Sequence, residues 1–314
     1  MLNRRHIRVK VMQSVYAMHQ NSSDNLEKEE KFLFHSIENI QDLYLTMLSI
    51  LIEIKIAEED FIEKSSKKHL ATKEERNPNM KFVNNAVFQL LTDNNSLSIA
   101  LEDRNINNWK LNDDYILLLL AEVKKSTIYA DYMANTKNDF EEDKQFAVDI
   151  FTEIIAPNEK LYDYLEDHKL TWVDDIPLVN TEIVKQLKQI KQSGENIFFV
   201  SRLYKDSDDK EFIRSLFRKT ILNEAELTKE FIDKTPNWDA DRIAEIDTII
   251  LKMAICEFLK FPSIPVKVTI NEYLEIAKEY STPKSSIFIN GILDNLIKEY
   301  QAENKLSKTG RGLM

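Results

Sequence analysis

The chain has 314 residues, of which 43% are hydrophobic and 30% are charged, and its formal net charge is −11. This negative charge argues against a protein that coats nucleic acid over its whole surface, and the single cysteine, Cys256, excludes a disulfide within the chain. The sequence lacks both an apolar run of the roughly 18–20 residues that a membrane-spanning helix needs and the apolar core of a signal peptide, so we expect a cytoplasmic protein.

The first predicted helix, Arg4 to Gln20, is amphipathic and basic. Apolar residues recur along it at helical spacing, which predicts one buried face: Ile7, Val11, Val15 and Met18. Its basic residues all precede the first acid, Asp24: Arg4, Arg5, Arg8 and Lys10. A locally basic helix on an acidic body indicates either a solvated N-terminus or a patch that contacts phosphates.

The middle of the chain is predicted to be helical throughout. Residues 25–68 lack proline and carry apolar residues at helical spacing, which predicts one or two long helices. Further helical patterns occupy 82–100, 113–135, 143–155 and 178–190. The segment Ile197 to Val200 is compatible with a short strand or with a buried helical turn.

A weak internal repeat runs through this region. Eight residues recur 66 positions later with the same identity. Asp143, Lys144, Phe146, Phe151, Ile155, Leu161, Asp167 and Trp172 return as Asp209, Lys210, Phe212, Phe217, Ile221, Leu227, Asp233 and Trp238. The repeat indicates either a degenerate copy of one helical unit or a coincidence between amphipathic helices of similar composition.

The segment Pro265 to Leu293 carries the most specific pattern. Thr269 and Glu272 have the spacing of a capping box, and Thr282-Pro283 has that of an N-cap followed by proline at the first helical position. Gly291 lies inside a helical apolar pattern, where glycine costs about 1 kcal/mol relative to alanine. We therefore expect a neighbouring helix to pack against Gly291, so that Gly291→Leu would cost about 1–3 kcal/mol through overpacking.

No catalytic, metal or cofactor pattern is evident in the sequence. The four glycines form neither a dinucleotide-binding nor a phosphate-binding loop, and the five histidines lack the spacing of a zinc site. Cys256 lies in the most apolar predicted helix, where a buried structural thiol is more common than a nucleophile. The sequence predicts a protein that is not an enzyme and that binds neither metal nor cofactor.

Three segments resemble the NusB family of transcription antitermination factors. The C-terminal segment reads VKV-x-INE-x-x-E-x-AK from Val266 to Lys278 and FINGILD from Phe288 to Asp294. Asp241 to Leu259 is similar to the family's central buried helix, and Arg4 to Gln20 to its arginine-rich first helix. The resemblance implies an all-α fold, a NusB-like helical bundle with an additional helical insertion.

The resemblance also implies a division of the chain. Residues 1–24 would form the basic first helix of the bundle, and residues 25–204 a helical insertion, which the repeat would make a degenerate NusB-like unit. Residues 205–300 would supply the C-terminal helices of the bundle, and the polar residues 301–314 a disordered tail.

Family members act as RNA-binding adaptors in transcription antitermination at ribosomal RNA operons. They bind a single-stranded boxA-type RNA together with the ribosomal protein NusE and join a complex on RNA polymerase. In this chain the resemblance implies RNA-binding residues that would position phosphates or stack on a base: Arg4, Arg5, Arg8, Lys10, Lys267 and Phe288. The implied contacts to the protein partner are Tyr16, Asp247 and Lys284. Pro283-Lys284 stand where relatives often carry acids, which leaves the strength of partner binding open.

Two other functions are considered. The chain could be an interaction scaffold or a homo-oligomer that has lost RNA binding, with the insertion covering the basic face; a homodimer is also compatible with the adaptor role. A NusB-like domain also precedes the catalytic domain of ribosomal RNA cytosine methyltransferases. That chemistry needs a glycine-rich cofactor loop and a reactive cysteine outside the helical domain, and the sequence offers neither.

Overall fold

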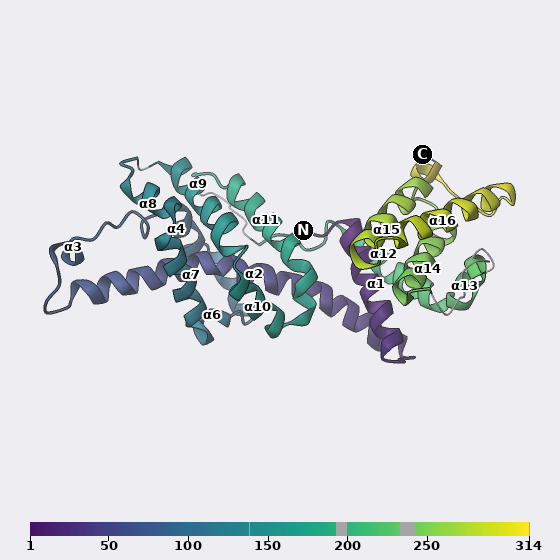
Figure 1. Cartoon of the computed structure of the whole chain (residues 1–314), viewed down its shortest axis with the longest axis horizontal. Helices are drawn as coiled ribbons and strands as arrows, with labels where there is room; N and C mark the ends of the chain where they lie inside the picture. Colours follow the sequence, from purple (N-terminus) through teal and green to yellow (C-terminus); the bar gives the residue numbers. More distant parts are fainter. Residues whose placement is uncertain (138, 193–199, 233–242, 314) are drawn as a thin grey trace. The chain divides into compact units, whose positions relative to one another are not determined.

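The computed structural model describes residues 1–137, 139–192, 200–232 and 243–313. Every regular element within these ranges is a helix (Figure 1), which confirms the all-α fold class. None of the described helices is both long and apolar enough to cross a bilayer. Residues 197–199, where the sequence is compatible with a strand, lie outside the described ranges.

The chain divides into two compact units. We call residues 38–203, with Met1, the middle unit, and residues 2–37 with 204–314 the terminal unit. The first boundary falls within helix α2 (Leu26–Ser66). The proline-free stretch, which predicts one or two long helices, therefore forms one.

The middle unit is built from short helices and the later part of α2. They are α3 (Lys73–Arg76), α4 (Ala86–Thr92), α5 (Asn95–Asp103), α6 (Asn108–Leu111), α7 (Asp113–Lys125), α8 (Thr127–Ala134), α9 (Phe140–Ile150), α10 (Glu159–His168) and α11 (Ile176–Gln189). A π-helical turn, Phe151–Ile155, continues α9, and a 3-10 helix, Leu170–Asp175, precedes α11. Two predicted helices are each interrupted by a residue whose side chain caps the next helix, Asn94 before α5 and Ser126 before α8. Such side chains offer the backbone an alternative partner and so favour a new helix start.

The terminal unit is organised around one buried helix, α14 (Glu245–Lys260). Every residue of α14 from Ile249 to Phe258 is buried, and the helix packs against α1 (Arg4–Gln20), α12 (Ser207–Leu222), α13 (Glu224–Ile232), α15 (Val266–Tyr280) and α16 (Ser285–Ala302). A short 3-10 helix, Gly310–Leu313, follows. The predicted central buried helix is thus confirmed, and it brings the N-terminal α1 against the C-terminal helices.

The order of helices in the middle unit recurs in the terminal unit. The run α9 with its π-helical turn, α10 and α11 has the same order, and nearly the same spacing, as α12, α13 and α14. Three repeated pairs are buried in both copies: Phe146 and Phe212, Phe151 and Phe217, Leu161 and Leu227. Asp233 and Trp238 lie outside the described residues, and a duplication stays a prediction.

The capping box predicted at Thr269 and Glu272 is wrong. α15 begins at Val266, after Pro265, so both residues lie inside the helix. Their side chains bind groups from other helices instead: the Thr269 hydroxyl donates to Glu257 and the Glu272 carboxylate accepts from Arg5. Long-range partners therefore outcompete the local cap.

Two further predictions for this segment need correction. α16 begins at Ser285 rather than at Pro283. The residues before it form a turn in which the Ser285 N–H donates to the Thr282 carbonyl at 2.9 Å and the two hydroxyl groups lie 2.8 Å apart. Gly291 is exposed, and a Cβ added there would meet no atom within 4 Å beyond its own helix. It is therefore not a helix-crossing residue.

Candidate nucleic-acid interface

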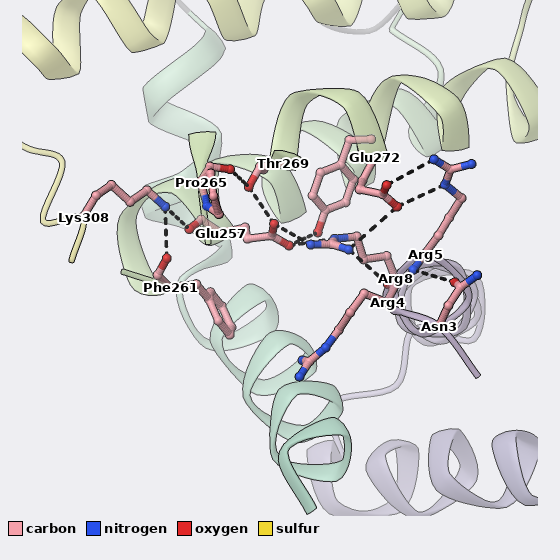
Figure 2. A network of polar contacts seen from close by, with 11 residues as sticks. Asn3, Arg4, Arg5, Arg8, Glu257, Phe261, Pro265, Thr269, Glu272 and Lys308 are labelled. Atoms are coloured by element: carbon pink, nitrogen blue, oxygen red, sulfur yellow. Dashed lines mark hydrogen bonds and ion pairs between the residues drawn. The ribbon is translucent and has the colours of Figure 1, made fainter. Parts of the chain in front are cut away.

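The basic start of α1 is fixed by a side-chain cap. The Asn3 carboxamide oxygen accepts hydrogen bonds from the backbone N–H groups of Arg5 at 2.9 Å and His6 at 3.0 Å. Asparagine is among the strongest N-caps because it satisfies N–H groups that have no partner inside the helix. The cap sets the first turn of α1, and with it the directions of the three arginines that follow (Figure 2).

Arg8 forms a buried, bidentate ion pair with Glu257 of α14. Its Nε lies 2.9 Å from Glu257 Oε2 and its Nη2 lies 2.7 Å from Oε1, and the two side chains are only 2% and 0% exposed. The Glu257 carboxylate also accepts from Thr269 at 2.6 Å and from Tyr273 at 3.3 Å. Burial alone would lower the pKa of Arg8, but the charge and hydrogen bonds of Glu257 outweigh it and hold that pKa above its ordinary value. Arg8 thus joins α1 to α14.

Arg5 and Arg4 are paired but remain partly exposed. Arg5 makes two bonds to Glu272, at 3.0 and 3.1 Å, and this hydrogen bonding raises its pKa. Arg4 lies 3.3 Å from Asp209 and 4.4 Å above the Phe212 ring. The Arg5 side chain is 41% exposed and the Arg4 side chain is 43% exposed, so both remain accessible to solvent.

A cavity of about 1040 Å³ lies beside these arginines, within the terminal unit. Its wall combines the start of α1 with α12, the α14–α15 loop and the 3-10 helix near the C-terminus. Six cationic side chains line it: Arg4, Arg5, Arg8, Lys219, Lys260 and Arg311. Three carboxylates line it: Asp208, Glu211 and Glu272. Asp209 and Glu257, which pair with Arg4 and Arg8, lie next to this wall, so six cations stand against five carboxylates. A small positive excess remains although the whole chain is acidic, which suits an anionic ligand.

The other predicted RNA-binding residues do not line this cavity. Lys10 is buried, Lys267 is exposed on the first turn of α15, and Phe288 is half-buried on α16. The structure thus brings Arg4, Arg5 and Arg8 to one cavity and leaves Lys10, Lys267 and Phe288 outside it.

The predicted partner-contact residues lie on other parts of the terminal unit. Tyr16 is exposed on α1 and Lys284 is exposed just before α16. Asp247 is buried and accepts hydrogen bonds from Ser281 at 2.6 Å and Ser285 at 2.7 Å. Asp247 therefore holds the loop that presents Lys284, rather than facing solvent itself.

Several residues of the cavity wall are not apparent from the sequence. Lys219 belongs to α12, Lys260 is the last residue of α14 and Phe261 follows it. Arg311 belongs to the C-terminal segment predicted to be disordered. The one sequence signal is Lys260-Phe261-Pro262, because a basic residue followed closely by proline indicates the C-terminal end of a helix. Among the described residues no group of histidine, cysteine, aspartate and glutamate side chains could hold a metal ion.

Comparison with known proteins identifies relatives of part of the chain. The sequence model of the NusB family matches residues 178–298. The transcription antitermination protein NusB of Salinibacter ruber is 44% identical over 113 residues, which are 36% of this chain and 70% of that protein. The protein of the same name from Chloroherpeton thalassium is 41% identical over 109 residues, which are 35% of this chain and 52% of that protein. The one from Koribacter versatilis is 35% identical over 127 residues, which are 40% of this chain and 87% of that protein.

No solved structure matches the chain at a significant level. The relatives align over at most 40% of the chain, and the extra length agrees with an enlarged protein. The buried α14, the arginine-rich α1 and these similarities lead to one conclusion: the chain belongs to the NusB family, as an enlarged member.

Proposed function

We propose that the protein is an antitermination adaptor that binds boxA-type single-stranded RNA at the cationic cavity. The observation that carries this proposal is the gathering of Arg4, Arg5 and Arg8 at one positive cavity in an acidic chain. Phosphate contacts by arginine and lysine supply most of the sequence-independent affinity for nucleic acids. The names of the NusB relatives support the role in transcription antitermination.

The three arginines have different tasks in this proposal. Arg4 and Arg5 contact phosphates, because their side chains are 43% and 41% exposed and can reach a bound strand while their carboxylate partners stay in place. Arg8 is a positioning residue, since it is buried against Glu257. Lys219 and Lys260 lie on the same wall and add charge.

We propose that the opposite end of α1 binds the NusE-type protein partner. Tyr16 lies twelve residues after Arg4, which corresponds to about 18 Å along a helix. Near this end, His19 lies 3.3 Å from Glu245, on the first turn of α14 that also carries Asp247. RNA and partner would therefore occupy separate ends of α1, so one can bind without displacing the other.

RNA titration of an arginine variant tests the RNA site. Arg4→Ala/Arg5→Ala should remove most of the affinity for a labelled single-stranded RNA that carries a boxA element. Lys229→Ala/Lys298→Ala removes the same charge from exposed positions outside the cavity and is the matched control. With about four phosphate contacts, log affinity of the parent should fall with log salt at a slope near −3. Adding the NusE partner should tighten RNA binding by the parent.

A scaffold without RNA binding is the second candidate. It is favoured by the fact that Arg4, Arg5 and Arg8 each already have a carboxylate partner. If the parent fails to bind RNA at low salt, with or without NusE, the adaptor proposal is wrong and the scaffold becomes the better assignment.

A further inference from the structure

The chain after α16 turns back toward α14 through a defined helix end. Asn304 adopts a left-handed conformation with φ of 54°. The N–H of Lys305 donates to the Tyr300 carbonyl at 2.9 Å and that of Asn304 to the Gln301 carbonyl. This pairing is the Schellman motif, in which a residue with positive φ ends the helix and redirects the chain.

The redirected segment docks on the C-terminal end of α14. Lys308 Nζ donates to the carbonyl oxygens of Glu257 at 3.2 Å and Phe261 at 3.0 Å (Figure 2). The Thr309 N–H donates to the Pro262 carbonyl at 3.0 Å. The last carbonyls of a helix have no partner inside it, and a lysine there is also favoured by the helix dipole. Glu257 thus anchors Arg8 with its side chain and Lys308 with its backbone.

Two glycines permit this docking and fix the residue between them. Gly310 has a φ of +54°, a conformation that other residues rarely adopt. At Gly312 an added Cβ would lie 2.0 Å from the Pro262 carbonyl oxygen, so the backbone contact exists only with glycine. Arg311 is held between these two positions, and its side chain lines the cationic cavity.

Arg311 completes a group of cations that lack carboxylate partners. Among the described residues, Lys219, Lys260 and Arg311 form no ion pair with an aspartate or a glutamate. Lys219 instead donates to the Lys260 carbonyl at 3.3 Å and lies 4.7 Å above the Phe261 ring. Within this described part of the chain no ion pair offsets these three positive charges, so an anion bound in the cavity would be attracted to them.

We propose that residues 308–313 form one wall of the RNA site and that Arg311 contacts a phosphate of the bound strand. The inference rests on the proposed RNA binding and extends it to a segment of the chain that the predicted interface does not include. Arg311 supplies affinity without sequence preference, since a phosphate contact carries no base information.

Titrations with two RNAs of equal length, one with a boxA element and one scrambled, test this assignment. Arg311→Ala should weaken binding of both RNAs by about fivefold and reduce the salt slope by about 0.7. Gly312→Ala should give the same loss, because it displaces the segment, and the double variant should lose no more. Lys305→Ala is the matched control: it removes a tail charge that is paired with Glu303 at 2.9 Å and that does not line the cavity.

The outcomes separate the two proposals. If Arg4→Ala/Arg5→Ala loses RNA affinity while Arg311→Ala and Gly312→Ala bind like the parent, the C-terminal segment is not part of the site and the RNA-binding proposal stands. The inference is also overturned if Arg311→Ala loses no more RNA affinity than Lys305→Ala. The change in net charge would then account for the loss. Absence of RNA binding by the parent overturns both.

Discussion

At the scale of single residues, the buried Arg8–Glu257 pair is the most consequential contact. Removing one partner of such a pair leaves an uncompensated charge in the core, which costs about 3–5 kcal/mol. Glu257 has four hydrogen-bond donors from Arg8, Thr269 and Tyr273. We therefore expect Glu257→Gln to lower the free energy of unfolding by several kcal/mol, as measured by chemical denaturation.

The matched control for this prediction is Glu272→Gln. Its main partner Arg5 is 41% exposed, and exposed pairs contribute only about 0–1 kcal/mol. If Glu257→Gln and Glu272→Gln lowered the free energy of unfolding equally, burial would not account for the stabilisation by the Arg8–Glu257 pair. The same reasoning makes Arg8→Ala unsuitable as a probe of RNA binding, since it would destabilise the fold.

Replacement of glycine by alanine should have different effects on the free energy of unfolding at Gly291 and at Gly312. Gly291→Ala should raise the free energy of unfolding by about 1 kcal/mol, because the site is open and alanine is the better helix former. Gly312→Ala should not stabilise the protein, because its Cβ would overlap the Pro262 carbonyl. Urea denaturation of both variants measures the two signs, and a loss of stability for Gly291→Ala would mean that the α16 surface is covered.

At the scale of helices, His19 at the end of α1 is coupled to α13 and α14. His19 lies 2.9 Å from Glu224 and 3.3 Å from Glu245, and Lys252 also binds Glu224 at 2.5 Å. The hydrogen bond to Glu224 raises the pKa of His19 above 6.5. The same bond, joined by that of Lys252, lowers the pKa of Glu224 to about 2.

These shifts predict a pH window for the contact. The stabilisation by His19 is fully present below its unfolded pKa of 6.5 and is lost as the pH rises through the higher folded value. The stabilisation by Glu224 is present above its unfolded pKa of 4.5 and is lost as the pH falls toward its folded pKa of about 2. The difference in free energy of unfolding between the parent and His19→Gln should therefore be largest between about pH 4.5 and 6.5 and shrink by pH 9. Gln20→Ala removes a hydrogen bond from an amide that does not titrate to Glu245, and it should show no such change between pH 6 and pH 9. A flat profile for His19→Gln as well would refute the coupling.

At the scale of the whole molecule, the terminal unit is assembled from both ends of the chain. Its internal contacts join distant segments, such as Glu30 at the start of α2 with Arg214 of α12 at 3.1 Å. We propose that the terminal unit is the NusB-like bundle and that the middle unit is an insertion into it. Replacing residues 38–203 by a glycine–serine linker of about 20 residues, which spans roughly 25 Å, should then leave a cooperatively folding protein.

Circular dichroism and RNA titration measure the outcome of this deletion. We expect cooperative thermal unfolding and an RNA affinity within about threefold of the parent, as for changes at independent sites. The same deletion combined with Glu257→Gln is the control, which should lose the transition. A deletion variant that fails to fold would show that the bundle needs the middle unit.

The sequence by itself determined the helical fold, the family and the basic character of α1. Hydrophobic periodicity depends on neighbours three and four residues apart, so it predicted α1 and the long helical stretch of α2 directly. The buried α14 was instead predicted from the resemblance to the family's central helix. The motif from Val266 to Asp294 is specific enough to indicate the NusB family without any knowledge of how the helices pack.

Only the tertiary structure decided what each polar residue of the site does. Arg4, Arg5 and Arg8 are alike in sequence, yet Arg8 is buried because Glu257, 249 positions away, lies opposite it. Thr269 and Glu272 have the spacing of a local cap but serve partners on other helices, and Arg311 reaches the cavity only because Lys308 docks on α14. Periodicity is a local property of the chain, whereas the choice of a hydrogen-bond partner depends on which distant groups the packed helices bring within about 3 Å.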